Sequence, residues 1–308
     1  MACPLRMARR YQDARDLLGL ARRYDIEIVH AHDVWLAAYA RLVARRLNIA
    51  YAVHVRGPLS RHDIRKHRLA QADAVIAVAR RYADDLVAGG VPPERVHLID
   101  DAVDLTIFDP ALAHAGHYRV PDGAKIVIGF VGRICAEKMV REFLEIIARL
   151  PFEACARSRV LIAGECSERR HAEAVRATMA ALDLTADVQF VGRVPASSMP
   201  EFLAGIDLLV TLSGGSAMFE AMAMGKPVLS IRADGRHSVH TPHEEAALCV
   251  DTFDPSACAQ ELARLISDDQ LRLRLGRAGR ARVEGHLSLG TMVKKTLDVY
   301  DRLAATTV

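Results

Sequence analysis

Two segments of the sequence combine glycine with cationic or hydroxyl side chains in a way that suits a phosphate group. The first runs from Gly132 through Arg133 to Lys138 (GRICAEK) and directly follows an apolar run. Charge-assisted hydrogen bonds from two such cations contribute about 1.5–3 kcal/mol each to the binding of an anion. The segment therefore predicts a diphosphate site, and the alternative is an ordinary exposed charged loop.

The second segment is Ser213-Gly214-Gly215-Ser216, which opens a predicted helix that ends at Gly225. A Gly-Gly turn at the start of a helix leaves backbone N–H groups free to bind phosphate. Glu220 falls on the second turn of this helix, within reach of a ligand ribose. Its alternative role is that of a solvated helix carboxylate. Because its sequence neighbours are apolar, we favour a binding role.

One pair of histidines has the spacing of metal ligands on a strand. His30 and His32 are separated by a single residue, so an extended backbone points both side chains to one face. Structural and catalytic zinc sites use at least three protein ligands, and the sequence identifies no third one here. We therefore expect no metal site.

The elements that must position these residues follow from hydrophobic periodicity. Short β-rich runs alternate with longer helical segments, which is typical of parallel βα units. The predicted strands are residues 26–30, 49–54, 74–78, 95–99, 125–132, 159–163, 188–191, 206–212 and 227–231. The predicted helices include residues 34–47, 80–87 and 142–150, and three more follow Pro255. Ser198 and Glu201 have the spacing of a helix capping box.

The order of these elements predicts an α/β protein with two Rossmann-like, doubly wound parallel-sheet domains. Residues 1–108 form the first domain and residues 125–308 the second, whose last helix is a candidate to pack back on the first. Between them, residues 109–124 carry Asp, Pro and Gly without sustained periodicity and predict a linker. Ligands of such sheets bind at the carboxyl ends of strands, where both glycine segments lie.

Composition narrows the class of protein. The 308 residues include 41 Lys and Arg against 38 Asp and Glu, a net charge of +3 that is too small to indicate nucleic acid as a partner. The six cysteines contain no Cys-x-x-Cys pair, which favours reduced thiols. No apolar run reaches the roughly 18 residues of a membrane span, and no secretory signal is evident. We expect a cytoplasmic protein.

A family resemblance appears at residues 220–228 (EAMAMGKPV), which resemble the hallmark of glycosyltransferase family 4, a family with the GT-B fold. Other segments agree with that family in order and spacing: residues 28–32 (IVHAH), 74–78 (AVIAV), 132–138, 188–192 (VQFVG) and 272–283. The resemblance extends from about residue 10 to the end of the chain. A single one of these motifs is weak, but the ordered set is specific.

The resemblance implies roles for individual residues. Arg133 and Lys138 match the pair that binds the donor diphosphate and stabilises the departing nucleotide. Glu220 matches the second carboxylate of the family's Glu-x7-Glu motif, which holds the ribose, and Val194 matches a backbone position near the nucleobase. His54 matches a histidine that faces the transferred sugar. The donor-binding candidates are thus Gly132, Arg133, Lys138, Val194, Gly214, Gly215, Ser216 and Glu220, and the catalytic candidates are His54, Arg133 and Lys138.

Three features depart from the family pattern. Family members begin with a strand and a Gly-rich loop, whereas this chain starts in the helix ahead of residues 26–30, so we expect an incomplete N-terminal domain with an exposed sheet edge. Leu212 stands where the first acid of Glu-x7-Glu is expected, beside the donor sugar. Met139 replaces the glycine that usually follows the lysine.

The resemblance implies a retaining, metal-independent glycosyltransferase, and we expect no cofactor. It would move a sugar from a nucleotide-diphosphate sugar to a glycan or lipid-linked acceptor, in cell-surface polysaccharide synthesis. One alternative is a catalytically silent nucleotide-sugar-binding or scaffold protein, and another is a sugar-nucleotide epimerase of the same fold. The arginines between Arg6 and Arg23 leave open a peripheral contact with a membrane surface, and the exposed edge leaves open a homo-oligomer.

Overall fold

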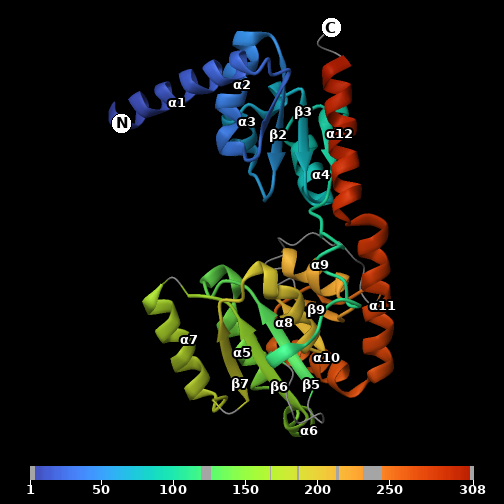
Figure 1. Cartoon of the computed structure of the whole chain (residues 1–308). Helices are drawn as coiled ribbons and strands as arrows, with labels where there is room; N and C mark the ends of the chain where they lie inside the picture. The colour runs from blue at the N-terminus through green and yellow to red at the C-terminus, as the bar shows by residue number, and fades with distance from the viewer. Residues whose placement is uncertain are drawn as a thin grey trace. The chain divides into compact units, whose positions relative to one another are not determined.

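The computed structural model describes residues 4–118, 126–166, 168–185, 187–212, 215–231 and 245–305. The chain forms two compact units, which Figure 1 shows. Unit 1 comprises Met1–Asp101 and Gly290–Val308, and unit 2 comprises Ala102–Leu289. Each unit is built around a parallel β-sheet.

Unit 1 contains a four-stranded sheet in the order β1-β2-β3-β4. Its strands are β1 (Ile28–Ala31), β2 (Ala50–Val55), β3 (Ala74–Ala77) and β4 (Val96–Leu98). Its α-helices are α1 (Pro4–Arg23), α2 (Ala37–Leu47), α3 (Arg61–Lys66), α4 (Arg80–Ala88) and, at the C-terminus, α12 (Leu289–Ala305). Short 3-10 helices occupy Val34–Leu36, Leu69–Gln71 and Pro93–Arg95. Within the described residues, β1 pairs with β2 alone and forms one edge of the sheet.

Every residue of β2 is buried because helices cover both faces of the unit 1 sheet. Tyr51, Val53 and Val55 point to the face covered by α2, α3 and α4. Ala50 and Ala52 point to the other face, where they pack with Val299 and Leu303 of α12. Side chains alternate along a strand, so His54 belongs to the face covered by α12.

Unit 2 contains a six-stranded sheet in the order β10-β9-β8-β5-β6-β7. Its strands are β5 (Ile126–Val131), β6 (Ser158–Ala163), β7 (Val188–Gly192), β8 (Leu208–Thr211), β9 (Val228–Ile231) and β10 (Leu248–Val250). Its α-helices are α5 (Val140–Ile147), α6 (Phe152–Ala156), α7 (Arg169–Ala181), α8 (Met199–Gly205), α9 (Ser216–Ala223), α10 (Pro255–Ser267) and α11 (Asp269–His286). Short 3-10 helices occupy Gly116–Tyr118, Ala136–Lys138 and Ala196–Ser198.

Two apolar clusters hold the helices of unit 2 against its sheet. On one face, Ile128 and Val210 pack with residues of α5, α7 and α10, which include Phe143 and Leu262. On the other face, Leu209 packs with residues of α8, α9 and the end of α11. The sheet is therefore doubly wound, as the alternation of β-rich and helical segments predicts.

Residues 102–118, which the sequence assigns partly to the first domain and partly to the linker, belong to unit 2. Val103 forms a parallel bridge with Ser288, and Phe108 is buried in the core of unit 2. Tyr118 packs edge-on against Phe202. Residues 102–118 thus pack on unit 2, and the boundary between the units falls after Asp101. Burial of these apolar side chains anchors a segment whose composition resembles that of a loop.

Two local expectations from the sequence are wrong or incomplete. Ser198 does not cap α8, because a 3-10 helix runs directly into α8 and leaves the Ser198 backbone in a helical conformation without a side-chain cap bond. The reciprocal capping box lies instead at Ser60 and Asp63, at the start of α3. The short strand β10 is not predicted, since its three residues lack a periodic apolar signal.

The described helices include none that is both long and apolar enough to span a membrane. The exposed edge expected at residues 26–30 corresponds to β1. An apolar groove of about 320 Å³ runs along this edge and is lined by α1, β1 and α2, with Leu17, Leu20 and Tyr24 among its residues.

Candidate functional site

The topology of unit 2 brings the two glycine segments to one point. β5 lies at the centre of the sheet beside β8. The chain proceeds from β5 to β6 and β7 on one side and then crosses to β8, β9 and β10 on the other. Loops diverge at such a topological switch point and leave a crevice at the carboxyl ends of the two strands. The loop after β5 carries Gly132 and Arg133, and the loop after β8 leads to Gly215.

Lys138 connects these two loops. Its Cδ atom lies 3.3 Å from the position of an ideal Cβ on Gly132, so the aliphatic part of the side chain lies over that glycine. Its Nζ atom lies 3.6 Å from the corresponding position on Gly215, at the start of α9. The ammonium group therefore stands beside the N-terminus of α9, although Lys138 belongs to the loop after β5.

The electrostatic environment of Lys138 favours an incoming anion. Burial lowers the pKa of Lys138 from its ordinary value; the positive charge of Arg133 adds to this effect, and Cys135 and Glu137 oppose it. Neither cation forms an ion pair with a carboxylate of the described residues. A bound phosphate would add negative charge beside the two cations and relieve the repulsion between them.

The N-terminus of α9 adds backbone donors to this cationic point. Gly215 is the N-cap residue, with φ 100° and ψ −175°, and no described side chain caps the helix. The first N–H groups of an uncapped helix carry a partial positive charge and bind anions. Ser216, the first residue of α9, is exposed. Gly214, the other glycine of the predicted turn, lies outside the described residues.

Glu220 lies one helical turn after Ser216 on the same face of α9. The Ser216 hydroxyl donates a hydrogen bond to the Glu220 carboxylate. Glu220 is half-buried, and burial raises the pKa of its carboxyl group. A partly desolvated carboxylate at a crevice is typical of a binding residue.

Val194 lies in the loop between β7 and the 3-10 helix at Ala196–Ser198. Its side chain is half-buried and packs on the apolar cluster that contains Leu161 and Ala163. Strand β6 separates β7 from β5 in the sheet, so Val194 lies two strands away from the loop of Gly132. The described residues of unit 2 thus place Val194 at the same edge of the sheet, to one side of the cationic point.

Leu212 faces away from the crevice. It continues the alternation of Leu208 and Val210, and its side chain is buried with theirs in the core beneath α5 and α10. A carboxylate at this position of the described backbone would lie in an apolar cluster. The sequence therefore differs from the family motif at a residue that contributes here to packing.

Met139 occupies a backbone conformation that glycine favours. Its φ of 57° and ψ of 42° lie in the left-handed region, at the junction of the 3-10 helix Ala136–Lys138 and α5. A methionine thus adopts a conformation that glycine would adopt more easily, at a cost of about 1–2 kcal/mol. The side chain of Met139 packs on the core of unit 2.

Gly164 is a site residue that the sequence motifs did not identify. A Cβ atom on Gly164 would overlap the carbonyl oxygen of Gly132. The Gly132 amide donates to Ala163 O at 3.0 Å, and the Ile134 amide donates to Glu165 O at 2.9 Å. The loop after β6 therefore supports the loop that carries Arg133. The sequence signal that could have identified Gly164 is its position directly after the predicted strand 159–163.

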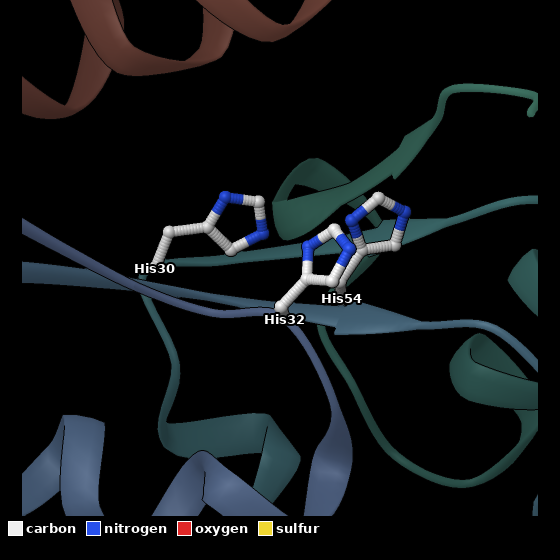
Figure 2. Close-up of side chains that lie close together, drawn as sticks. All are labelled: His30, His32 and His54. Carbon is white, nitrogen blue, oxygen red and sulfur yellow. The ribbon is translucent and has the colours of Figure 1, made fainter. Parts of the chain in front are cut away.

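His54, the remaining candidate, belongs to unit 1, whereas all the others belong to unit 2. It lies near the carboxyl end of β2 and is buried. Two further histidines of unit 1 lie beside it: its ring stacks on that of His30, with 5.5 Å between centroids, and meets the ring of His32 at 5.3 Å (Figure 2). The structure thus adds a third histidine to the His30 and His32 pair, which the sequence did not reveal.

A cavity of about 590 Å³ in unit 2 lies elsewhere. It is lined by Asp207 and Pro227, which precede β8 and β9, and by residues of α11 such as Arg277. These positions are at the amino ends of the strands, whereas ligands of doubly wound sheets bind at the carboxyl ends. The volume of a cavity alone does not identify the site.

Comparisons with known families agree with this geometry. Residues 119–282 match the family model described as Glycosyl transferases group 1, and residues 2–107 match the model described as Glycosyltransferase Family 4. The first match contains Arg133, Lys138, Val194 and Glu220, and the second contains His54.

Similar proteins have been described in several bacteria. A D-inositol 3-phosphate glycosyltransferase of Salinispora tropica is 28% identical over 255 residues, which are 77% of this chain and 52% of that protein. A GDP-mannose-dependent alpha-mannosyltransferase of Mycobacterium tuberculosis is 29% identical, over 75% of this chain and 62% of that protein. The chain thus spans between about half and two-thirds of these relatives. The crystal structure of Anabaena HepE in complex with UDP and glucose superposes with a TM-score of 0.80 at 17% identity, over 94% of this chain and 80% of that one.

Proposed function

The chain belongs to the group 1 glycosyl transferases, and from this premise we propose that it binds a nucleoside diphosphate sugar in unit 2. It transfers the sugar with retention of anomeric configuration to a glycan or lipid-linked acceptor, in the assembly of cell-surface polysaccharide. The transfer itself uses neither a metal ion nor a redox cofactor.

The observation that carries this proposal is the position of Lys138 beside the uncapped N-terminus of α9. When the bond between the anomeric carbon and the diphosphate oxygen breaks, the electron pair leaves with the diphosphate. Lys138, Arg133 and the first N–H groups of α9 supply positive charge where this negative charge develops. Preorganised charge of this kind is commonly the largest single contribution to catalysis.

Glu220 and Val194 bind the remainder of the donor. The carboxylate of Glu220 accepts hydrogen bonds from the ribose hydroxyls, one helical turn along α9 from the phosphates. The backbone at Val194 contacts the nucleobase. Ser216 keeps the Glu220 carboxylate oriented through its hydrogen bond. A buried, oriented acceptor discriminates strongly against ligands that lack the matching hydroxyl donor.

The acceptor hydroxyl oxygen forms the new bond to the anomeric carbon on the face that the diphosphate leaves. Its proton passes to the departing phosphate oxygen, so that no protein group is required to hold it. His54 orients the transferred sugar. As a buried and uncharged imidazole, it offers a hydrogen-bond donor or acceptor without adding a charge.

The comparisons support a nucleotide-sugar donor, but the similar proteins differ in the nucleotide and the sugar that their names contain. The relative from Mycobacterium tuberculosis depends on GDP-mannose by name, and Anabaena HepE was solved with UDP and glucose. The relative from Salinispora tropica is named for D-inositol 3-phosphate. A nucleoside diphosphate is the chemistry that two of these names share, and the geometry of unit 2 suits it.

A second candidate function is donor binding without transfer. Leu212 favours it, because the acid that the family places beside the donor sugar is here an apolar residue of the core. Such a protein would keep the nucleotide site of unit 2 and lack turnover.

An assay of turnover separates these two functions. The protein is incubated with UDP-, GDP- and ADP-linked hexoses, with and without oligosaccharide acceptors, and released nucleotide and the product anomer are followed by NMR. We expect one donor to be consumed with retained configuration and Lys138→Ala to lose that activity. Binding of a donor without turnover would assign the silent function, and an inverted product would contradict the retaining mechanism.

A further inference from the structure

Three histidines of unit 1 converge at the carboxyl ends of β1 and β2. Ala31 of β1 pairs with Val53 of β2. The residues that follow them, His32 and His54, therefore lie side by side. His30 precedes His32 by two residues and therefore points to the same face. One nitrogen atom from each ring lies within 4.8 Å of one nitrogen from each of the others. Figure 2 shows nitrogen atoms of neighbouring rings turned toward one another.

These rings have the open hydrogen-bonding capacity that a metal ion requires. Nε2 of His30 and both ring nitrogens of His54 are buried without a hydrogen-bond partner among the described residues. Buried polar atoms are paired in the great majority of cases, so three unpaired nitrogens in one cluster call for a ligand. Imidazole nitrogen is a preferred ligand atom of zinc and of copper, iron and nickel.

We propose that His30, His32 and His54 bind one divalent transition-metal ion of the zinc class, with its fourth coordination position open. Three histidine ligands with a free fourth position make a tetrahedral site at which water or a substrate atom completes the coordination. We take zinc as the representative ion because imidazole nitrogen is one of its preferred ligand atoms. In addition, its d-electrons impose no preferred coordination geometry.

Two of the rings also have polar contacts outside the cluster. Nδ1 of His30 lies 2.6 Å from the Tyr300 hydroxyl on α12. When this Nδ1 donates to Tyr300, the lone pair is on Nε2, the atom that faces the cluster. Nε2 of His32 lies 3.1 Å from a guanidinium nitrogen of Arg56, which also pairs with Asp101 at 2.8 Å.

Closure of the site requires a small movement. Three bonds of about 2.0–2.1 Å to one ion at tetrahedral angles place the nitrogens roughly 3.3 Å apart. His32 is exposed, so its ring is free to rotate inward and exchange the Arg56 contact for the ion. Arg56 keeps Asp101 as its partner after this exchange. Because Arg56 competes for His32 and repels a cation, its removal should strengthen metal binding.

This inference shares His54 with the proposed transfer reaction, in which His30 and His32 have no role. All of its residues belong to unit 1, whereas the diphosphate site belongs to unit 2. The two proposals are tested by different readouts, since one concerns a bound metal ion and the other a bound nucleotide.

The test is a titration of the metal-free full chain with Co²⁺ followed by visible absorption, and with Zn²⁺ followed by calorimetry. We expect one ion per chain, intense visible cobalt bands typical of a tetrahedral site, and no thiolate-to-cobalt band in the near ultraviolet. Because His32→Gln changes an exposed residue, the variant should still fold. It should bind the metal ion at least about tenfold more weakly than the wild type does. Arg56→Met should strengthen metal binding.

His62→Gln is the matched control, since His62 is an exposed histidine of the same unit, on α3. It should leave the affinity unchanged. Equal affinity in the His32→Gln variant and the wild type would overturn the proposal. A thiolate band that accompanies binding would assign the ion to a cysteine and overturn it as well.

Discussion

The Nζ atom of Lys138 lies 3.6 Å from the position that a Cβ atom on Gly215 would occupy. This proximity joins the loop after β5 to the start of α9, although 77 positions of sequence numbering separate the two residues. It places an ammonium group and helix N–H groups at one point of the crevice. A phosphate at that point gains from both at once.

Gly215→Ala should weaken nucleotide binding and lower stability. The backbone at Gly215, with φ 100° and ψ −175°, lies in a region that is almost exclusive to glycine. A residue with a Cβ there costs of order 1–3 kcal/mol or forces the helix start to move. Chemical denaturation and nucleotide titration measure the two effects.

Gly285→Ala is the control for this variant. Gly285 is a residue of α11 in the same unit, and a Cβ atom there would meet no atom within 4 Å. Gly285 lies in the last turn of α11, where alanine should keep stability or raise it by up to about 1 kcal/mol. Equal effects of the two substitutions would contradict a special role for the Gly215 backbone.

Glu220→Gln should stabilise the free protein near neutral pH while it weakens donor binding about tenfold or more. Burial raises the folded-state pKa of Glu220 above its unfolded value, so the folded protein holds the proton more tightly. The free energy of unfolding then falls as pH rises from the unfolded pKa through the folded one. The uncharged amide of Glu220→Gln removes this loss of stability. It has only one oxygen atom, however, to accept hydrogen bonds from the ribose hydroxyls.

Thermal denaturation of wild type and Glu220→Gln across pH, with nucleotide titrations at neutral pH, measures both halves of this prediction. The stability difference should disappear at acidic pH, where Glu220 is protonated in both states. A variant that binds the nucleotide as tightly as the wild type would remove Glu220 from the ribose site.

Gly164→Ala should displace the loop that carries Arg133. The added methyl group would overlap the carbonyl oxygen of Gly132, which is backbone and cannot rotate away. Overpacking of this kind typically costs 1–3 kcal/mol. We expect lower stability in denaturant unfolding and weaker nucleotide binding, although Gly164 makes no proposed donor contact. Binding equal to that of the wild type would show that the two loops are not coupled.

Leu212→Glu should destabilise unit 2 without a gain in turnover. It restores an acid that the family motif contains, but the Leu212 side chain is 1% exposed within the apolar core. An unpaired carboxylate there costs several kcal/mol or shifts its pKa upward. Thermal unfolding and donor-consumption assays check both points. An increase in turnover with little loss of stability would mean that this position faces the donor sugar.

Much of the fold could be predicted from the sequence because apolar periodicity reflects burial directly. Residues 49–54 and 159–163 differ from β2 and β6 by a single residue at one or both ends. Strand β10 was not predicted, because three residues are too few to show a hydrophobic period. The segment 102–118 was predicted as part domain and part linker because its composition is loop-like, whereas its role in packing comes from contacts such as that of Phe108.

The candidate site could be predicted in residue types but not in distances. The chemistry of Arg133, Lys138 and Glu220 is evident from their charges and neighbours. The support of Gly132 by Gly164 depends on how two loops approach, which no local pattern records. The same holds for His54 beside His32, since that contact follows from the register between β1 and β2.

The central claim is that unit 2 binds a nucleoside diphosphate at Lys138 and the start of α9. Calorimetric titration of UDP, GDP and ADP into wild type, Arg133→Ala, Lys138→Ala and Arg176→Ala tests it most directly, with Arg176 as an exposed arginine of α7 in the same unit. We predict that one nucleotide binds the wild type and the Arg176 variant equally and binds each of the other two at least about tenfold more weakly. Equal affinity for all four proteins, or no binding of any nucleotide, would contradict the account.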